Sequence, residues 1–193
     1  MSFLPHIATE QIEQLPLADF KGNIIVVENL GKEYRDALEA LNKEKVIGFD
    51  TETKPCFVAK APKNRMALLQ LSTESAAYIF RLQPLGLPEE LCSILSNPAI
   101  IKVGAAVRDD IHGLNTYAKF NASGFADLQI LAEKFGIQEK SVRKMSAIIL
   151  GIRVSKSQQL SNWESSRLSE AQLKYAAIDA WVCREMFIKL MSV

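Results

Sequence analysis

The sequence has 193 residues, of which 48% are hydrophobic and 23% are charged, and its formal net charge at pH 7 is +1. This length suits one domain, the composition excludes disordered, collagen-like and low-complexity proteins, and no apolar run approaches the roughly 20 residues of a membrane-spanning helix. Because the net charge is close to zero, a nucleic-acid partner would have to be bound by a local basic patch.

The first half of the chain predicts mainly strands. Residues 1–22 are expected to form an N-terminal arm, and residues 23–193 a single domain. Short apolar segments predict four strands, at 24–27, 46–50, 66–71 and 77–80. The last two are separated by a short, mostly polar segment and are expected to form a hairpin. Apolar residues at helical spacing predict a helix that follows Gly31.

The second half of the chain alternates between strand and helix signals. One further strand is predicted at 100–104, and helices are predicted at 88–95, 110–117, 128–135, 141–150 and 169–190. Asp127, Ser141 and Ser169 are suitable N-caps, and Gly136 and Gly151 are suitable C-terminal stops. An early group of strands followed by interleaved strands and helices indicates α/β layers around a mixed sheet.

The first chemical feature is the pair Asp50 and Glu52. Strand residues two apart point to the same face, so both carboxylates would lie at the C-terminal end of a buried strand. Open α/β sheets bind their ligands at that end. About one such pair is expected by chance in a chain of this length, so its place after the strand carries the interpretation.

Two further groups of acids follow other predicted elements. Asp109 and Asp110 come shortly after the strand 100–104, although acids are also common at helix N-termini because of the helix dipole. Tyr175 and Asp179 share one face of the last helix, where neighbouring alanines would let the helix approach the sheet closely. The alternative for this pair is an exposed acid beside a half-buried tyrosine.

Asp50, Glu52, Asp110 and Asp179 could converge on one site. Carboxylates packed together raise one another's pKa, and divalent cations would make such a cluster tolerable. Ligands that are all oxygen suit Mg²⁺ or Mn²⁺ better than zinc. Two such ions about 4 Å apart can clamp a phosphoryl centre, activate a water and stabilise the leaving oxygen.

Three segments resemble the motifs of the DEDD 3′–5′ exonucleases: Phe49-Asp-Thr-Glu-Thr-Lys-Pro, Lys102-Val-Gly-Ala-Ala-Val-Arg-Asp-Asp and Tyr175-Ala-Ala-Ile-Asp-Ala-Trp. The tyrosine four residues before the last acid resembles the DEDDy branch, which includes ribonuclease D and the Werner-syndrome-type exonuclease domain. Leu68-Leu-Gln-Leu-Ser and Ser161-Asn-Trp-Glu are also similar to that branch. The resemblance covers residues 24–190.

This resemblance implies an RNase H-like, three-layer α/β fold with a mixed five-stranded core sheet flanked by helices. It implies metal-dependent removal of nucleotides from the 3′ end of DNA or RNA, with release of nucleoside 5′-monophosphates. Two Mg²⁺ or Mn²⁺ ions would be held directly by Asp50, Glu52 and Asp179. Asp110 would hold the second ion through water, and Tyr175 would orient the attacking water.

Asp109 is the alternative to Asp110. The family motif places an apolar residue four positions after its acid, so Leu114 favours Asp110, whereas Gly113 would be the partner of Asp109. The other branch of these enzymes carries a histidine in the third motif, and this chain has none there. Tyrosine has an unperturbed pKa of about 10 and is a poor base at neutral pH, so the metal would lower the pKa of the water.

Basic residues around an aromatic side chain follow the first motif. Lys54, Phe57, Lys63 and Arg65 suit a single-stranded end through phosphate pairing and base stacking, and the alternative is a solvated loop. Lys156 is a further candidate phosphate contact. Gln159 replaces a basic residue of some relatives of the Werner-type domain, and Trp163 is expected to anchor the last helix in the core.

The remaining expectations concern alternatives and location. A nucleic-acid-binding protein on a decayed exonuclease fold and a small-nucleotide phosphodiesterase are the two alternative functions. The N-terminus lacks the features of a secretory signal, and three cysteines far apart favour a reduced, cytoplasmic protein. No membrane or partner protein is predicted. The choice between DNA and RNA depends on contacts to the 2′-OH, which the sequence leaves open.

Overall fold

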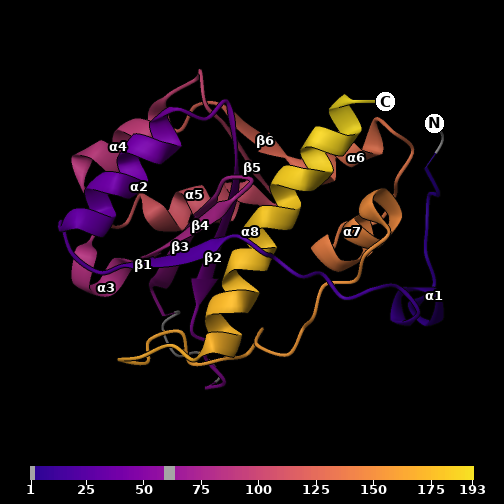
Figure 1. The fold of residues 1–193 in the computed structure, drawn as a ribbon, viewed down its shortest axis with the longest axis horizontal. Coiled ribbons are helices and arrows are strands. Elements are labelled where there is room, and N and C mark those ends of the chain that lie inside the picture. Colours follow the sequence, from indigo (N-terminus) through magenta and orange to yellow (C-terminus); the bar gives the residue numbers. More distant parts are fainter. Residues whose placement is uncertain (1–2, 59–63) are drawn as a thin grey trace.

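The computed structural model describes residues 3–58 and 64–193, with one mixed sheet at its centre (Figure 1). The sheet has the strand order β1-β4-β3-β2-β5-β6, with bounds β1 Asn23–Val27, β2 Val46–Thr53, β3 Met66–Ser72, β4 Ala76–Arg81, β5 Ile101–Gly104 and β6 Phe125–Asp127. The helices of the described residues are α1 Thr9–Glu13, α2 Lys32–Asn42, α3 Leu82–Leu85, α4 Glu89–Ser96, α5 Val107–Leu114, α6 Leu128–Glu133, α7 Val142–Leu150 and α8 Glu170–Met191. β3 is antiparallel to β2 and β4, and the other neighbouring strands are parallel.

The predicted α/β class with a mixed sheet flanked by helices is confirmed, but the core sheet has six strands rather than five. The additional strand is β6, which pairs with β5 from Lys102 opposite Phe125 to Gly104 opposite Asp127. Three residues are too few to show an alternating pattern, and in the sequence Asp127 is visible only as a helix cap. Tertiary pairing with β5 therefore specifies this edge strand.

Several predicted helix bounds differ from the structure by one to three residues, and two helices were not predicted. α5 begins at Val107 rather than at Asp110, because the chain turns into the helix at Ala106, which adopts a left-handed conformation with φ of 56°. α1 and α3 have five and four residues and were not expected, since such short helices show no periodicity. None of the helices within the described part of the chain combines the length and apolarity needed to span a bilayer.

Helices cover both faces of the sheet. On one face, residues of α2, α4 and α5 form a core with strand residues such as Phe49 and Phe80. On the other face, α8 contacts β2, β3, β4 and β5, and α6 and α7 pack beside it. Figure 1 shows α8 crossing the sheet, with α2 and α4 at one end of the molecule and α6 and α7 at the other. Of the acids described below, Asp179 belongs to α8, and Asp110 belongs to α5 on the other face.

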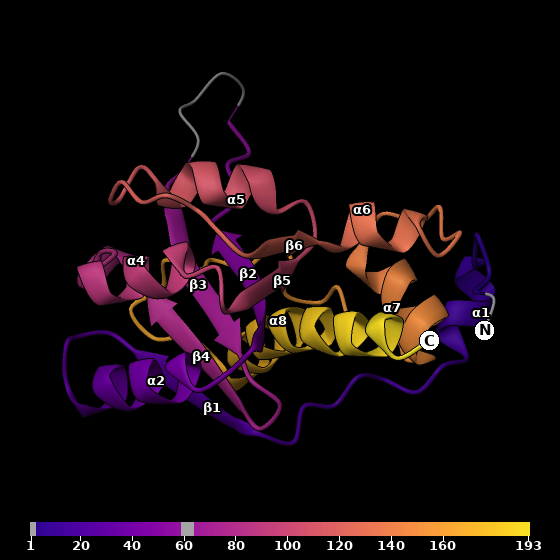
Figure 2. The ribbon, with the colours of Figure 1, turned by 90° about the horizontal axis from the view of Figure 1, so that it is seen from above.

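The N-terminal arm packs along the segment that joins α6, α7 and α8. The backbone N–H of Gln138 donates to the carbonyl of Pro5 at 2.9 Å. Arg153 bonds through its backbone to Pro16 and Ala18, at 2.9 and 2.8 Å. In Figures 1 and 2, α1 lies next to α7. The arm is therefore attached to the chain that leads from α7 to α8.

Candidate active site

Three carboxylates from two elements meet at the C-terminal end of β2. Asp50 and Glu52 point to one face of β2, and Asp179 comes from α8. One carboxylate oxygen of each residue lies within 4.8 Å of the other two. Three buried or half-buried oxygen donors at this spacing fit a divalent cation that prefers oxygen ligands, such as Mg²⁺ or Mn²⁺.

α8 reaches the strand because Gly48 has no side chain. A Cβ atom at Gly48 would collide with the carbonyl oxygen of Ala180, the residue that follows Asp179. The alanines of this part of α8 are fully buried, in keeping with the small residues that predicted a close approach to the sheet. A direct contact between the backbones of β2 and α8 therefore brings Asp179 next to Asp50.

Asp110 lies beside this cluster on α5. Its Oδ1 accepts a hydrogen bond of 2.5 Å from the hydroxyl of Thr51, the residue between Asp50 and Glu52. Asp110 is also close enough for its charge to raise the pKa of both of those residues. Asp109 is exposed. The structure thus ties Asp110 to the end of β2 and leaves Asp109 on the surface.

The pKa of each of the four carboxyl groups is raised. Burial, followed by repulsion from the neighbouring carboxylates, raises the pKa of Asp50 well above its usual range and that of Glu52 to about 9. Burial raises the pKa of Asp179 to about 7 and that of Asp110 to about 6. Ionising these groups in the folded protein is therefore unfavourable in free energy, and a bound cation would offset that penalty.

Tyr175 lies one helical turn before Asp179 and packs against Trp163, with ring centroids 5.8 Å apart. Trp163 is fully buried, as expected of a core anchor. Burial, followed by the charge of Asp179, raises the pKa of Tyr175 above its usual value. Its hydroxyl therefore stays protonated at neutral pH, where it can donate a hydrogen bond and orient a water but cannot act as a base.

Two cavities border the end of β2. The smaller one, of about 300 Å³, lies between the carboxylates on one side and the α7 N-terminus and loop 154–159 on the other; it is lined by Asp50, Thr51, Glu52, Ser141, Val142, Arg143, Val154, Ser155, Lys156, Gln159, Tyr175 and Asp179. The larger one, of about 700 Å³, lies between α5 and the segments on either side of residues 59–63, and Thr53, Lys54, Arg65 and Asp110 are among its lining residues. A chain bound across β2 could occupy both.

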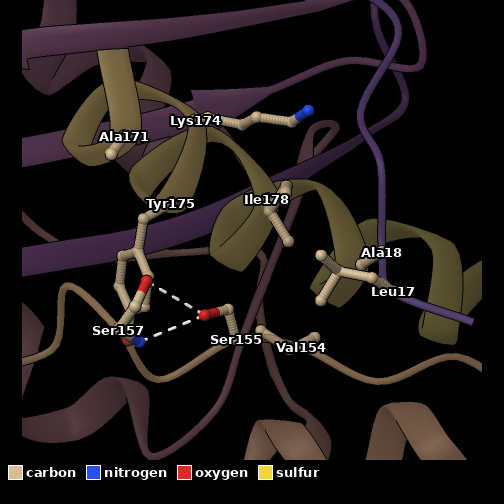
Figure 3. A pocket seen from close by; sticks show the side chains of 9 residues that line it. All are labelled: Leu17, Ala18, Val154, Ser155, Ser157, Ala171, Lys174, Tyr175 and Ile178. Carbon is tan, nitrogen blue, oxygen red and sulfur yellow. Dashed lines mark hydrogen bonds between the residues drawn. The ribbon is translucent and has the colours of Figure 1, made fainter. Parts of the chain in front are cut away.

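A third cavity, of about 210 Å³, shares Val154, Ser155 and Tyr175 with the 300 Å³ cavity that contains the carboxylates (Figure 3). Its lining is mostly apolar, and Leu17 and Ala18 of the N-terminal arm form part of it. The turn after Ser155 is held by its hydroxyl, which accepts from the backbone N–H of Ser157 at 3.1 Å. The arm therefore packs behind one wall of the carboxylate cavity.

Two predicted substrate-binding residues, Lys54 and Arg65, line the larger cavity. Lys54 pairs with Glu164, with 3.3 Å between Nζ and the carboxylate oxygen. The Arg65 guanidinium lies 3.8 Å from the ring centroid of Tyr117 and donates to the carbonyl of Thr116. Both cations are thus held at the edge of this cavity by neighbouring side chains or backbone.

The other predicted contacts are more dispersed. The side chain of Phe57 is 79% exposed, which excludes a role in the core and leaves the ring free for stacking. Lys156 and Gln159 line the 300 Å³ cavity that also contains the carboxylates. Lys63 lies outside the described residues.

Gly48, Thr51 and Arg143 were not singled out from the sequence. A glycine inside a buried strand indicates close approach of another backbone, so the role of Gly48 could have been predicted from the sequence. Thr51 could also have been considered, because it lies between the two acids of the first motif. Arg143 could not have been predicted, since only the tertiary fold brings α7 to the end of β2.

A comparison with protein families finds that the model for the 3′–5′ exonuclease family matches residues 29–193. DNA polymerase I of Aquifex aeolicus is 31% identical over 159 residues, which cover 82% of this chain and 26% of that protein. The chain spans about a quarter of the length of the curated relatives that it matches first.

Two solved structures show the same fold. The Nibbler EXO domain of Aedes aegypti has a TM-score of 0.74 and 25% identity, with 92% of this chain and 90% of that chain covered. RNase D of Escherichia coli has a TM-score of 0.77 and 24% identity, with 88% and 44% covered. The mixed sheet with α8 across it is thus shared with both.

Proposed function

This chain belongs to the 3′–5′ exonuclease family, and we propose that it hydrolyses nucleic acids from the 3′ end with two divalent cations, releasing nucleoside 5′-monophosphates. The resemblance that the sequence motifs indicated is confirmed by the family match. The observation that carries the proposal is the meeting of Asp50, Glu52 and Asp179 within 4.8 Å, with Asp110 beside them. We propose Mg²⁺ or Mn²⁺ as the cation, because the donors are all oxygen.

In this proposal the four acids and Tyr175 have separate tasks. Asp50, Glu52 and Asp179 would hold the cations directly, and Asp110, which accepts a hydrogen bond from Thr51, would hold the second one through water. Bound divalent cations would lower the pKa of a water and neutralise charge on the phosphate.

Tyr175 keeps its proton, because burial raises its pKa, and so its hydroxyl can hold the attacking water in line with the phosphorus. Packing against Trp163 restricts the ring and pre-orients that hydroxyl.

The substrate would lie across the end of β2. Lys54, Lys63 and Arg65 are proposed to pair with phosphates of the strand, Phe57 to stack on a base, and Lys156 to contact a phosphate near the carboxylates. The exposure of Phe57 and the place of Lys54 and Arg65 beside the larger cavity support this path. The phosphate contacts would make binding weaken as the salt concentration rises.

The extent and location of the active unit are also proposals. We propose residues 23–193 as the exonuclease domain and residues 1–22 as an arm attached to it, with DNA or RNA bearing a 3′ end as the substrate. A cytoplasmic location is proposed because all three cysteines are free.

The test of this function is a time course on 5′-labelled DNA and RNA, single-stranded and with recessed 3′ ends, in Mg²⁺, Mn²⁺ or EDTA. The expected result is a ladder that shortens from the 3′ end, releases nucleoside 5′-monophosphates and stops in EDTA. Unchanged bands in every lane, from protein shown to be folded, would contradict the proposal. They would favour a binding protein or a small-nucleotide phosphodiesterase.

The two acids of α5 are expected to differ sharply in activity. Asp110→Asn should lower kcat by about 10–100-fold, the usual cost of losing an outer partner of a metal site. Asp109→Asn should change kcat less than about threefold, because Asp109 borders the larger cavity as an exposed residue and its side chain makes no hydrogen bond to the end of β2 within the described residues. Steady-state kinetics with a Mg²⁺ titration measures both. The reverse order would assign the second-motif role to Asp109.

A further inference from the structure

Arg143 is a cation in a place that local structure disfavours. It is the second residue of α7, where the helix dipole disfavours positive charge, and no acid lies in that first turn. Its side chain is only 22% exposed, and one of its guanidinium nitrogens, Nε, is buried without a hydrogen-bond partner among the described residues. An unpaired buried donor costs stability. Two unfavourable features in one side chain suggest a role in function.

Arg143 also lines the cavity that contains the carboxylates. It lines this cavity with its neighbours Ser141 and Val142, and Asp50 and Asp179 line the same cavity. Its one ion pair within the described ranges is not with these acids but with Glu13, the last residue of α1 in the N-terminal arm. The guanidinium is therefore held by the arm, and it retains donors for a ligand in the cavity.

We propose that Arg143 is a phosphate-binding residue of this cavity, which donates to a phosphate group of the bound nucleotide strand, and that Glu13 is its positioning residue. The planar guanidinium matches two phosphate oxygens at once, which a lysine cannot do. The α7 N-terminus adds a positive dipole end on the same wall. Cations held by the carboxylates and the guanidinium of Arg143 would then contact the same phosphate within one cavity. The identity of the ligand as a nucleic-acid phosphate rests on the proposed function.

The test uses the full chain and calorimetric binding of thymidine 5′-monophosphate, with thymidine as the uncharged control, in the presence of Mg²⁺. The wild-type protein should bind the monophosphate more tightly than thymidine. Arg143→Gln should weaken binding of the monophosphate about 10–100-fold, as expected for charge-assisted hydrogen bonds, and leave the affinity for thymidine unchanged. The affinity of Arg143→Lys for the monophosphate should fall between those of the wild type and Arg143→Gln. Lys144→Gln is the matched control, because Lys144 is the next residue of α7, pairs with Glu139 and does not line the cavity.

The role of Glu13 is tested by a double-mutant cycle. Glu13→Gln should weaken binding of the monophosphate about 2–5-fold without changing thymidine binding. In the Arg143→Gln background it should have no further effect on the affinity for the monophosphate. A purely structural contact would lower the melting temperature and affect both ligands alike. Equal losses in the two backgrounds would remove Glu13 from the proposal.

Failure of this inference can be separated from failure of the proposed function. If folded Arg143→Gln protein binds the monophosphate as the wild type does, or if the wild type shows no preference for the monophosphate over thymidine, Arg143 does not bind phosphate. If the preference exists and depends on Arg143 but no nucleic acid is degraded, the phosphate site stands and the exonuclease proposal fails.

Discussion

Asp50→Asn should abolish exonuclease activity and at the same time raise the melting temperature of the metal-free protein. The loss in kcat is expected to be on the order of 10³-fold, because a direct ligand and its charge are removed from the reacting centre. The gain in stability follows from burial of Asp50 among carboxylates that raise its pKa well above its usual range. An amide of the same shape carries no charge into that environment.

The measurement pairs a kinetic assay in Mg²⁺ with thermal unfolding in EDTA. Each kcal/mol of relieved repulsion should raise the melting temperature by about 2–4 °C in a domain of this size. Asp36→Asn is the control, since Asp36 is exposed on α2 and its one ion pair among the described residues is with Lys32, and exposed pairs contribute little. A lower melting temperature for Asp50→Asn in EDTA would contradict the electrostatic account, and retained activity would remove Asp50 from the site.

Elements with strong local signals could be predicted from the sequence. Asp127, Ser141 and Ser169 each accept the expected hydrogen bond from a backbone N–H of the helix that follows. These caps lie within a few residues of what they cap, so the sequence shows them directly. The same is true of the β3–β4 hairpin, where the hydroxyl of Thr73 accepts from the N–H of Ala76 at 3.0 Å.

The parts that escaped prediction depend on distant residues. β6 exists only because β5 lies beside it. The contact of Gly48 with Ala180 sets the distance between two carboxylates, and it joins segments that the sequence does not connect. The pair of Glu13 with Arg143 spans 130 positions. Sequence motifs could therefore name the acids of the site, but not the backbone contact that assembles them or the arm packed behind its wall.

Without a divalent cation, the protein should lose stability as the pH rises from about 4 to about 9. The pKa values are about 6 for Asp110, about 7 for Asp179 and about 9 for Glu52, against about 4 in an unfolded chain. A folded state with the higher pKa binds protons more tightly. The stability that the folded state gains from this tighter proton binding is therefore complete below pH 4, and it is lost as the pH rises through each folded-state pKa. For Asp179 alone, three pKa units correspond to about 4 kcal/mol at most.

Mg²⁺ or Mn²⁺ should reverse this loss, and its stabilising effect should grow with pH. Cations bind the ionised carboxylates, so their affinity rises as the acids lose their protons, and a ligand that binds only the folded state stabilises it by mass action. Denaturant unfolding at pH 5, 7 and 9, with EDTA or with cation, measures the difference. The variant Asp179→Asn should show a smaller and flatter cation effect.

The test rests on the difference between the free energies of unfolding measured with cation and with EDTA, because other groups also titrate in this pH range. Burial lowers the pKa of Lys102 from its usual value of about 10.5 to about 8, so it costs stability in full below about pH 8, and this cost declines as the pH rises from about 8 to about 10.5. Asp19 has a pKa lowered to about 2 by Lys174 and Lys21, so its contribution is lost only below pH 4. Neither group belongs to the carboxylate cluster, so both contributions cancel when curves with and without cation are subtracted. A cation effect of equal size at pH 5 and pH 9 would mean that the carboxylates are already ionised at pH 5, and that their burial does not resist charge.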